Sequence, residues 1–147
     1  MEFTELLEII QGEPLFETGL LLSGDVNPRE IHRQLSRWRR AGKIHQLRRG
    51  LYCLAPPFQK VNPHPFLVAN RLLPGSYVSL QSALAYYGMI PEYVPVTTSI
   101  TTSRPSQWET PLGTFDFRHI QVDFFYGFQF VDLGENQRAF IATPEKA

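Results

Sequence analysis

Hydrophobic residues recur with a helical period in the first part of the chain and with a strand period in the last part. Within Glu2–Gln11 the apolar positions follow the spacing i, i+3, i+4 and i+7 of one helix face: Phe3, Leu6, Leu7 and Ile10. Pro14–Glu17 is too short and mixed for an assignment. Thr18 is a candidate N-cap for a brief helix over Gly19–Leu22, and Gly24 and Asp25 then favour a turn.

The next helix is specified at both ends. Asn27 is a favourable N-cap, Pro28 suits the first helical position, and Glu30 is placed to reach back to the Asn27 N–H as in a capping box. Gly42 follows Ala41 and suits the left-handed position after a helix C-terminus. The sequence therefore predicts a helix over residues 28–41.

This helix has one apolar face and one basic face. At 100° per residue, Leu35 and Trp38 lie within about 40° of Ile31. The opposite face, spanning about 140° to 240° from Ile31, holds a serine and four arginines: Ser36, Arg29, Arg40, Arg33 and Arg37. A solvated face usually mixes charges of both signs, because like charges at this spacing repel. We therefore interpret the arginine face as a contact surface for a polyanion.

A basic hairpin follows. Lys43–Leu47 and Leu51–Leu54 are two short strand-like runs, and Gly50 supplies the positive φ that a tight turn after Arg48 and Arg49 requires. A helix, a short helix, a longer basic helix and a hairpin follow each other in this order in the winged helix-turn-helix. In that module the last helix enters the major groove of DNA and the wing contacts the flanking backbone.

The second half of the chain has a different character. Four of the twelve prolines fall within residues 55–65, which predicts a semi-rigid extended linker over residues 56–65. A helix is expected over Pro65–Leu73 with Phe66, Ala69, Asn70 and Leu73 on one side, ended by Pro74 and Gly75. Tyr77 and Val78 are a short strand candidate, and Ser79 is a candidate cap for a helix over Leu80–Tyr87.

Four strands complete the prediction. They cover Val96–Thr102, Thr114–Val122, Phe124–Val131 and Arg138–Ala142, and the second alternates with Phe115, Phe117 and His119 on one side. Helices followed by strands indicate an α+β fold with a mainly antiparallel or mixed sheet. We thus expect a winged helix-turn-helix domain over residues 1–55 and a small α+β domain over residues 66–147. Nine of the 19 aromatic residues lie between Trp108 and Phe140, and we expect most in the core and some exposed for a partner.

The distribution of charge strengthens the polyanion interpretation. The net charge is zero, yet eight of the 14 Lys and Arg residues lie between Arg29 and Arg49, together with one acid, Glu30. Residues 1–25 carry six acids and no base. A local patch rather than the net charge determines attraction to nucleic acid.

The composition argues against a membrane-spanning, a secreted or a disulfide-linked protein. The longest apolar run is five residues, Ala83–Tyr87, against the roughly 20 that a membrane-spanning helix needs, and the N-terminus is acidic. These features predict a cytoplasmic protein that does not bind membranes. The single Cys53 cannot form an internal disulfide, and we interpret it as a small buried hydrophobe rather than a reactive thiol.

No catalytic or metal-binding set is evident. His32, His45, His64 and His119 are scattered, and Asp116 and His119 should lie on opposite faces of one strand. No paired carboxylates or phosphate-binding glycine loops occur at the required spacing. We therefore predict that the protein is not an enzyme and needs no cofactor or metal.

Three short sequence runs resemble motifs of one protein family and occur in the same order as in that family. LSRWRRAGKIHQLRRGLYCL (residues 35–54), YVSLQSALAYYGMI (residues 77–90) and ATPEKA (residues 142–147) are similar to motifs of AbiEi-type antitoxins, the regulatory half of type IV abortive-infection systems. The resemblance covers about residues 15–147. It implies an N-terminal winged helix that binds operator DNA upstream of its own gene, and a C-terminal region that counters a nucleotidyltransferase-like toxin.

The end of the chain bears on the second part of that expectation. Thr143, Pro144 and Glu145 are an N-cap, a first-turn proline and a helix-forming opening, but a one-turn helix is not stable by itself. We therefore expect the C-terminal domain to be truncated here.

The sequence favours a DNA-binding transcriptional regulator that resembles an AbiEi-type antitoxin. The alternative is a protein-interaction adaptor whose winged helix is only a scaffold, and an RNA-binding or nucleic-acid-processing protein is a weaker third hypothesis. Eight residues are predicted to contact DNA, five of them on the helix and three on the turn and hairpin: Arg29, Arg33, Ser36, Arg37 and Arg40, then Lys43, Arg48 and Arg49.

Overall fold

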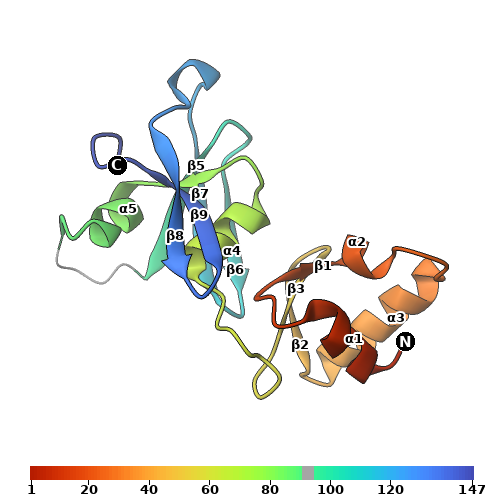
Figure 1. Ribbon diagram of the computed structural model, residues 1–147. Coiled ribbons are helices and arrows are strands. Elements are labelled where there is room, and N and C mark those ends of the chain that lie inside the picture. The colour runs from red at the N-terminus through yellow and green to blue at the C-terminus, as the bar shows by residue number, and fades with distance from the viewer. Residues whose placement is uncertain (91–94) are drawn as a thin grey trace. The chain divides into compact units, whose positions relative to one another are not determined.

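Helices and strands occur in both parts of the chain, as the α+β prediction requires. The structure, a computed structural model, describes residues 1–90 and 95–147 and divides the chain into two units. Unit 1 is Met1–Pro63 and unit 2 is His64–Ala147 (Figure 1). Each unit has its own sheet, and each is described by itself below.

Unit 1 combines three helices with three strands. The helices are α1 (Phe3–Ile10), α2 (Thr18–Leu21) and α3 (Pro28–Arg40). The strands are β1 (Phe16–Glu17), β2 (Ile44–Arg48) and β3 (Leu51–Leu54), which form an antiparallel sheet in the order β1-β3-β2. The helices lie on one side of this sheet (Figure 1).

The core of unit 1 draws on every one of these elements. The predicted stripe of α1 supplies Leu6 and Ile10, and the predicted apolar face of α3 supplies Ile31, Leu35 and Trp38. Phe16 of β1 stacks on Tyr52 of β3 with ring centroids 5.7 Å apart. The apolar periodicity was thus sufficient to identify the buried faces of both long helices.

Two local details of unit 1 differ from the sequence predictions. Pro14–Glu17 was left unassigned, but Phe16 and Glu17 pair with Tyr52 and Leu51 as strand β1. A strand of two residues carries no periodicity, so only its partner reveals it. Thr18 is the first residue of α2 rather than its cap, because Glu17 has the extended conformation that precedes a helix.

Part of the predicted linker folds onto unit 1 instead of extending. The Phe58 and Gln59 amides donate to the Ala55 carbonyl at 2.9 and 3.2 Å, which closes a turn. The Phe58 ring packs edge-to-face against Phe3 at 4.9 Å between centroids. The four prolines favoured an extended segment, but the apolar Phe58 side chain gains more from burial against α1.

Unit 2 begins with two helices. The first, α4 (Pro65–Leu72), follows His64, whose Nδ1 accepts a hydrogen bond from the Phe66 amide at 3.1 Å. Its buried residues are Val68, Ala69 and Leu72. Of the four residues predicted to share one side of this helix, Ala69 is buried, and Phe66, Asn70 and Leu73 are partly exposed. The buried side depends on the strands on which α4 packs, and the helix pattern cannot identify them. The second helix, α5 (Leu80–Tyr86), follows Ser79 as predicted, although the Ser79 side chain makes no capping bond.

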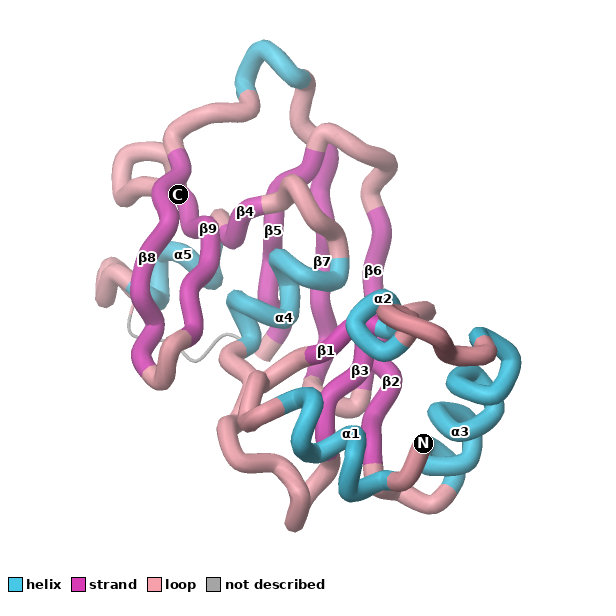
Figure 2. The backbone as a smooth tube through the Cα atoms, turned by 45° about the vertical axis from the view of Figure 1, so that its right-hand side comes forward, coloured by secondary structure: helices cyan, strands magenta, loops and turns pink. Residues whose placement is uncertain are grey.

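The sheet of unit 2 has six strands in the order β6-β7-β5-β4-β9-β8. The strands are β4 (Tyr77–Val78), β5 (Val96–Thr101), β6 (Ser106–Thr110), β7 (Gly113–His119), β8 (Phe128–Gly134) and β9 (Gln137–Ala142). The β4–β9 and β5–β7 pairs are parallel and the others antiparallel, which confirms a mixed sheet. Helix α4 lies across one face of it (Figure 2).

The strand predictions in unit 2 were right in kind and incomplete in number. Phe115 and Phe117 of β7 are buried on one side as the alternation predicted. Strand β6 was missed, because its sequence SQWET lacks the apolar alternation of a half-buried strand. The predicted strand starts and ends near residues 120–127 were also wrong, since Val122–Phe124 forms a short 3-10 helix.

No helix among residues 1–90 and 95–147 combines the length and the apolar character that crossing a lipid bilayer demands.

Candidate nucleic-acid interface

Helix α3 is held at both ends by the residues that the sequence suggested. The Asn27 side chain accepts a hydrogen bond from the Arg29 amide at 3.0 Å, and Pro28 is the first helical residue. At the other end Gly42 has φ +78°, and the Lys43 and Gly42 amides donate to the Trp38 and Arg39 carbonyls. These two bonds form a Schellman motif, so the helix ends at a fixed point.

One capping prediction was wrong. The Glu30 carboxylate forms an ion pair with the Arg33 guanidinium at 3.1 Å instead of reaching back to the Asn27 amide. Both side chains are well exposed, so this pair adds only a few tenths of a kcal/mol to stability. It does place one acid beside the basic face, and Arg33 is partly neutralised there.

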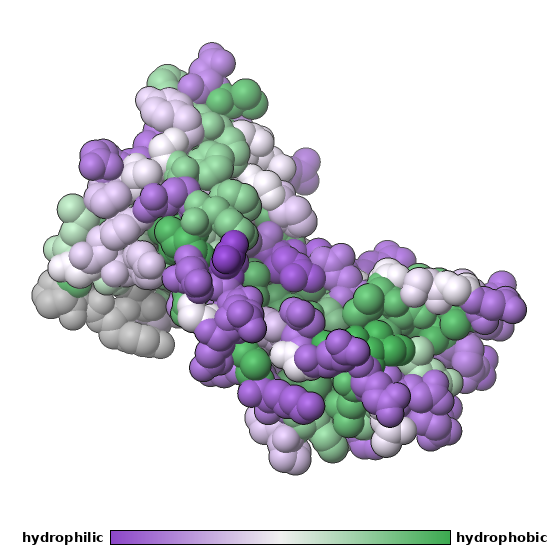
Figure 3. Space-filling model, in the orientation of Figure 1, coloured by the Kyte–Doolittle hydropathy of each residue, from purple (hydrophilic) through white to green (hydrophobic). Residues whose placement is uncertain are grey.

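The basic face of α3 is exposed along its whole length. All of the predicted helix residues lie in solvent, namely Arg29, Arg33, Ser36, Arg37 and Arg40. Arg40 donates a hydrogen bond to the Ser36 hydroxyl at 3.3 Å, which joins two of them. His32 and Arg39, which the sequence analysis did not include in the site, are exposed on the same helix. Figure 3 shows hydrophilic residues over much of the visible face of unit 1.

The structure separates the three predicted residues of the turn and hairpin. Lys43 precedes β2 and places its ammonium 4.9 Å from the centre of the Phe3 ring. Arg48 and Arg49 lie at the other end of β2, about 16 Å away at ~3.3 Å per residue. Arg49 is exposed, whereas the half-buried Arg48 donates to the Arg49 carbonyl at 2.8 Å. The hairpin thus presents Arg49 at its tip and Lys43 at its base.

Four polar residues near the hairpin tip were not predicted to form a site. Thr18, His32, Gln46 and Tyr52 line a hollow between α2, α3 and the hairpin, together with Arg49 and Gly50. They come from four separate elements of unit 1 and share no spacing in the chain. No sequence signal could have grouped them, because they meet through the pairing of β1 and β2 with β3 and through the packing of α3 against β2.

Unit 2 exposes several large aromatic side chains. Phe130 of β8 and Phe140 of β9 face each other across the strand pair, with ring centroids 4.6 Å apart. Phe130 is 55% exposed and Phe140 41%, and we call this pair the aromatic strip. Phe128 continues the row inward to Tyr77, whose burial raises the pKa of its hydroxyl. The row therefore runs from the core to the surface.

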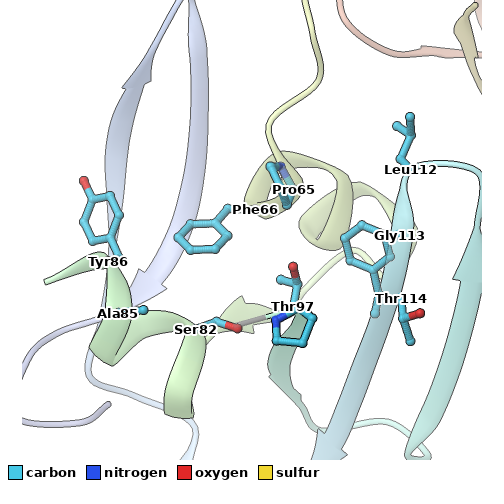
Figure 4. Close-up of a pocket in the computed structure, with 11 residues that line it drawn as sticks. Pro65, Phe66, Ser82, Ala85, Tyr86, Thr97, Leu112, Gly113 and Thr114 are labelled. Carbon is cyan, nitrogen blue, oxygen red and sulfur yellow. The ribbon is translucent and has the colours of Figure 1, made fainter. Parts of the chain in front are cut away.

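Unit 2 has a hollow of its own, and the residues that line it are uncharged. Figure 4 shows Phe66 of α4 opposite Tyr86 of α5, with Thr97 and Thr114 of the sheet on another side. The hydroxyl of Ser82 in its wall donates to the Val96 carbonyl and accepts from the Thr98 amide. The Ser82 hydroxyl is thus already bonded, and none of the described residues that line this hollow carries a charge.

The remaining candidate chemistry is limited. No three His, Cys, Asp or Glu side chains of residues 1–90 and 95–147 gather as a metal site would require. Asp116 and His119 do not combine, since Asp116 binds Arg118 at 3.3 Å and the His119 ring contacts the Ser103 carbonyl. Burial raises the pKa of Cys53 to about 11, so its thiol stays protonated at neutral pH. Comparison of the chain with protein-family models and with curated proteins finds no match.

Proposed function

We propose that the protein is a DNA-binding transcriptional regulator whose unit 1 is a winged helix-turn-helix. In this proposal α3 is the recognition helix, the β2–β3 hairpin is the wing, and the protein regulates its own operon. The order of elements in unit 1 supports it, since the basic helix is followed directly by the hairpin. The protein would act in the cytoplasm without catalysis.

One observation carries the proposal. Every arginine of α3 is exposed while Ile31, Leu35 and Trp38 on its opposite side are buried, so packing in unit 1 does not account for the arginines. Exposed guanidinium groups on a rigid helix bind phosphates and guanine edges in the major groove. Arg49 at the hairpin tip and Lys43 at its base suit the DNA backbone on either side.

Binding should depend steeply on salt. If about six phosphates are contacted, affinity falls on the order of a thousandfold between ~50 and ~200 mM salt. The test is a titration of the DNA upstream of its own gene across this range, with a shuffled duplex of the same length as control. A response that is flat with salt contradicts the proposal. Equal affinity for both duplexes would leave a DNA-binding protein without operator specificity.

A second function, antitoxin activity, is favoured by the aromatic strip of unit 2. The two contacting rings form an exposed apolar patch, and such patches often mark a binding surface. In the proposal the strip contacts a nucleotidyltransferase-like toxin, as the resemblance to AbiEi-type antitoxins implies. In the adaptor alternative the aromatic strip also binds a partner protein, but unit 1 does not bind DNA.

Two full-length variants separate these functions. Phe130→Ser with Phe140→Ser should abolish rescue of growth from the toxin encoded by the neighbouring gene and leave DNA binding unchanged. Arg33→Glu with Arg37→Glu should do the reverse. If neither the parent nor the arginine variant binds DNA while both rescue growth, the adaptor function is the better account.

A further inference from the structure

A polar hollow in unit 1, the hairpin cleft, has the chemistry of an anion site. It has a volume of about 530 Å³ and lies between α2, α3 and the hairpin. Its polar side chains are those of Thr18, His32, Gln46, Arg49 and Tyr52, and Leu22 and Gly50 complete the lining. These side chains all offer hydrogen-bond donors, and among the residues that the structure describes no carboxylate lines the cleft. A cleft that offers donors and no negatively charged group favours an anionic ligand over a cation.

The Thr18 hydroxyl gives an independent indication of a ligand. Thr18 is 8% exposed, and its hydroxyl oxygen has no hydrogen-bond partner among the described residues. A buried polar group without a partner destabilises a protein by about 1–3 kcal/mol, so it needs a reason. The Thr18 amide donates to the Gly50 carbonyl at 3.0 Å, which fixes the hydroxyl beneath the hairpin tip.

Two further groups in the cleft have donors to spare. The Gln46 amide nitrogen reaches only the Tyr52 hydroxyl, at the long distance of 3.5 Å, although the amide carries two N–H donors. The exposed Arg49 lies at the edge of the cleft and supplies the positive charge. Both groups are positioned by the β2–β3 pairing, in which Gln46 is opposite Tyr52.

We propose that the hairpin cleft holds one backbone phosphate of DNA, with Thr18 and Gln46 donating hydrogen bonds to it and Arg49 supplying charge. The inference rests on the proposed function and assigns a phosphate contact to neutral residues outside the arginine face. His32 of α3 and the hairpin tip both line the cleft, so the bound phosphate fixes the position of the hairpin relative to α3. Phosphate contacts of this kind set the register of a protein on the duplex.

The decisive variant is Thr18→Val, which removes the hydroxyl and keeps the shape. Since the hydroxyl has no partner in the free protein, the midpoint of thermal unfolding should stay the same or rise. Affinity for the upstream duplex should fall about tenfold, because a hydrogen bond to a charged group is lost. The slope of log affinity against log salt should not change, since no charge is removed, whereas Arg49→Ala should reduce it by about one.

Two controls isolate the hydroxyl. Thr4→Val makes the same substitution in unit 1 on the exposed surface of α1, outside the cleft, and should leave affinity and unfolding unchanged. Thr18→Ser restores the hydroxyl and should restore binding. If Thr18→Val fails to fold, Gln46→Leu removes an uncharged donor from the same cleft. It should weaken DNA affinity by about as much and leave the slope of log affinity against log salt unchanged.

The possible results separate this inference from the proposed function. A parent protein that does not bind DNA overturns both. A parent that binds, with Thr18→Val and Gln46→Leu binding equally well, overturns only the hairpin cleft as a phosphate site. A titration with inorganic phosphate at constant ionic strength tests the other source: saturable binding that Thr18→Val abolishes, with DNA affinity unaffected, assigns the cleft to a free anion and overturns the DNA assignment.

Discussion

The exposed sides of α3 and of the β8–β9 pair differ in the kind of partner they can select. Helix α3 presents arginines over a buried apolar face, whereas β8 and β9 present Phe130 and Phe140 beside a core row of aromatic rings. Charge acts over about a Debye length and tolerates imperfect fit, so the basic face indicates a class of partner, a polyanion. An aromatic strip acts only in contact, so its partner depends on a complementary shape.

The largest expected effect comes from reversing charge on the arginine face of α3. Arg33→Glu with Arg37→Glu should weaken DNA binding by about 2–6 kcal/mol, roughly 1–3 for each lost arginine, with little change in thermal unfolding. Electrophoretic mobility shift or fluorescence anisotropy measures it. Arg104→Glu with Arg138→Glu is the matched control, because it changes the net charge equally on exposed residues of unit 2. An equal loss in both variants would show that net charge alone attracts DNA.

A core substitution tests whether the basic face depends on the helix beneath it. Leu35→Ala should destabilise unit 1 by about 2–5 kcal/mol, because it leaves a cavity under α3. Ser36→Ala, one position along on the exposed side, should change stability by less than about 0.5 kcal/mol.

The two tryptophans give each unit a separate signal. Trp38 belongs to unit 1 and Trp108 to unit 2, so single-tryptophan variants follow one unit at a time by fluorescence in urea. Leu35→Ala should lower the midpoint of the Trp38 transition. A shift of the same size in the Trp108 transition would mean that the two units unfold together.

Removing the aromatic strip should have a smaller effect on stability. Phe130→Ser with Phe140→Ser deletes an exposed ring pair, which contributes about 0.5–1.5 kcal/mol beyond buried area. The variant should therefore unfold slightly earlier in urea while losing binding to the proposed toxin partner in analytical ultracentrifugation. Phe115→Ser, a buried position on β7, is the contrast and should be far more destabilising. If the exposed pair proves as destabilising as Phe115, the strip is part of the core and not a contact surface.

The smallest expected effect is a pH dependence confined to unit 2. Burial lowers the pKa of His64, and its Nδ1 must be unprotonated to accept the Phe66 amide. The folded state thus binds the proton less readily than the unfolded state, so stability is full above about pH 6.5 and falls as the pH drops below it. His64→Asn keeps a cap acceptor without a titrating group and should flatten the profile. The midpoint of the Trp108 transition between pH 5 and 8 measures both, and a profile that His64→Asn leaves unchanged would assign the effect to other groups.

The sequence determined the features that depend on neighbouring residues. Asn27, Pro28 and Gly42 define the ends of α3 through bonds to adjacent backbone, and the 100° period assigns Ile31, Leu35 and Trp38 to the core. Gly50 defines the hairpin turn in the same way. The same period assigns the arginines to the solvent-exposed side of α3, because they lie opposite its apolar face.

Only the tertiary structure decided the features that depend on distant partners. The two-residue strand β1, the polar strand β6 and the buried side of α4 exist because of pairing with β3, β7 and the unit 2 sheet. The hairpin cleft belongs to this group, since Thr18, Gln46 and Tyr52 meet through the sheet and not through the chain. The pairing of Phe130 with Phe140 has the same origin, because the register of β8 against β9 places the two rings side by side.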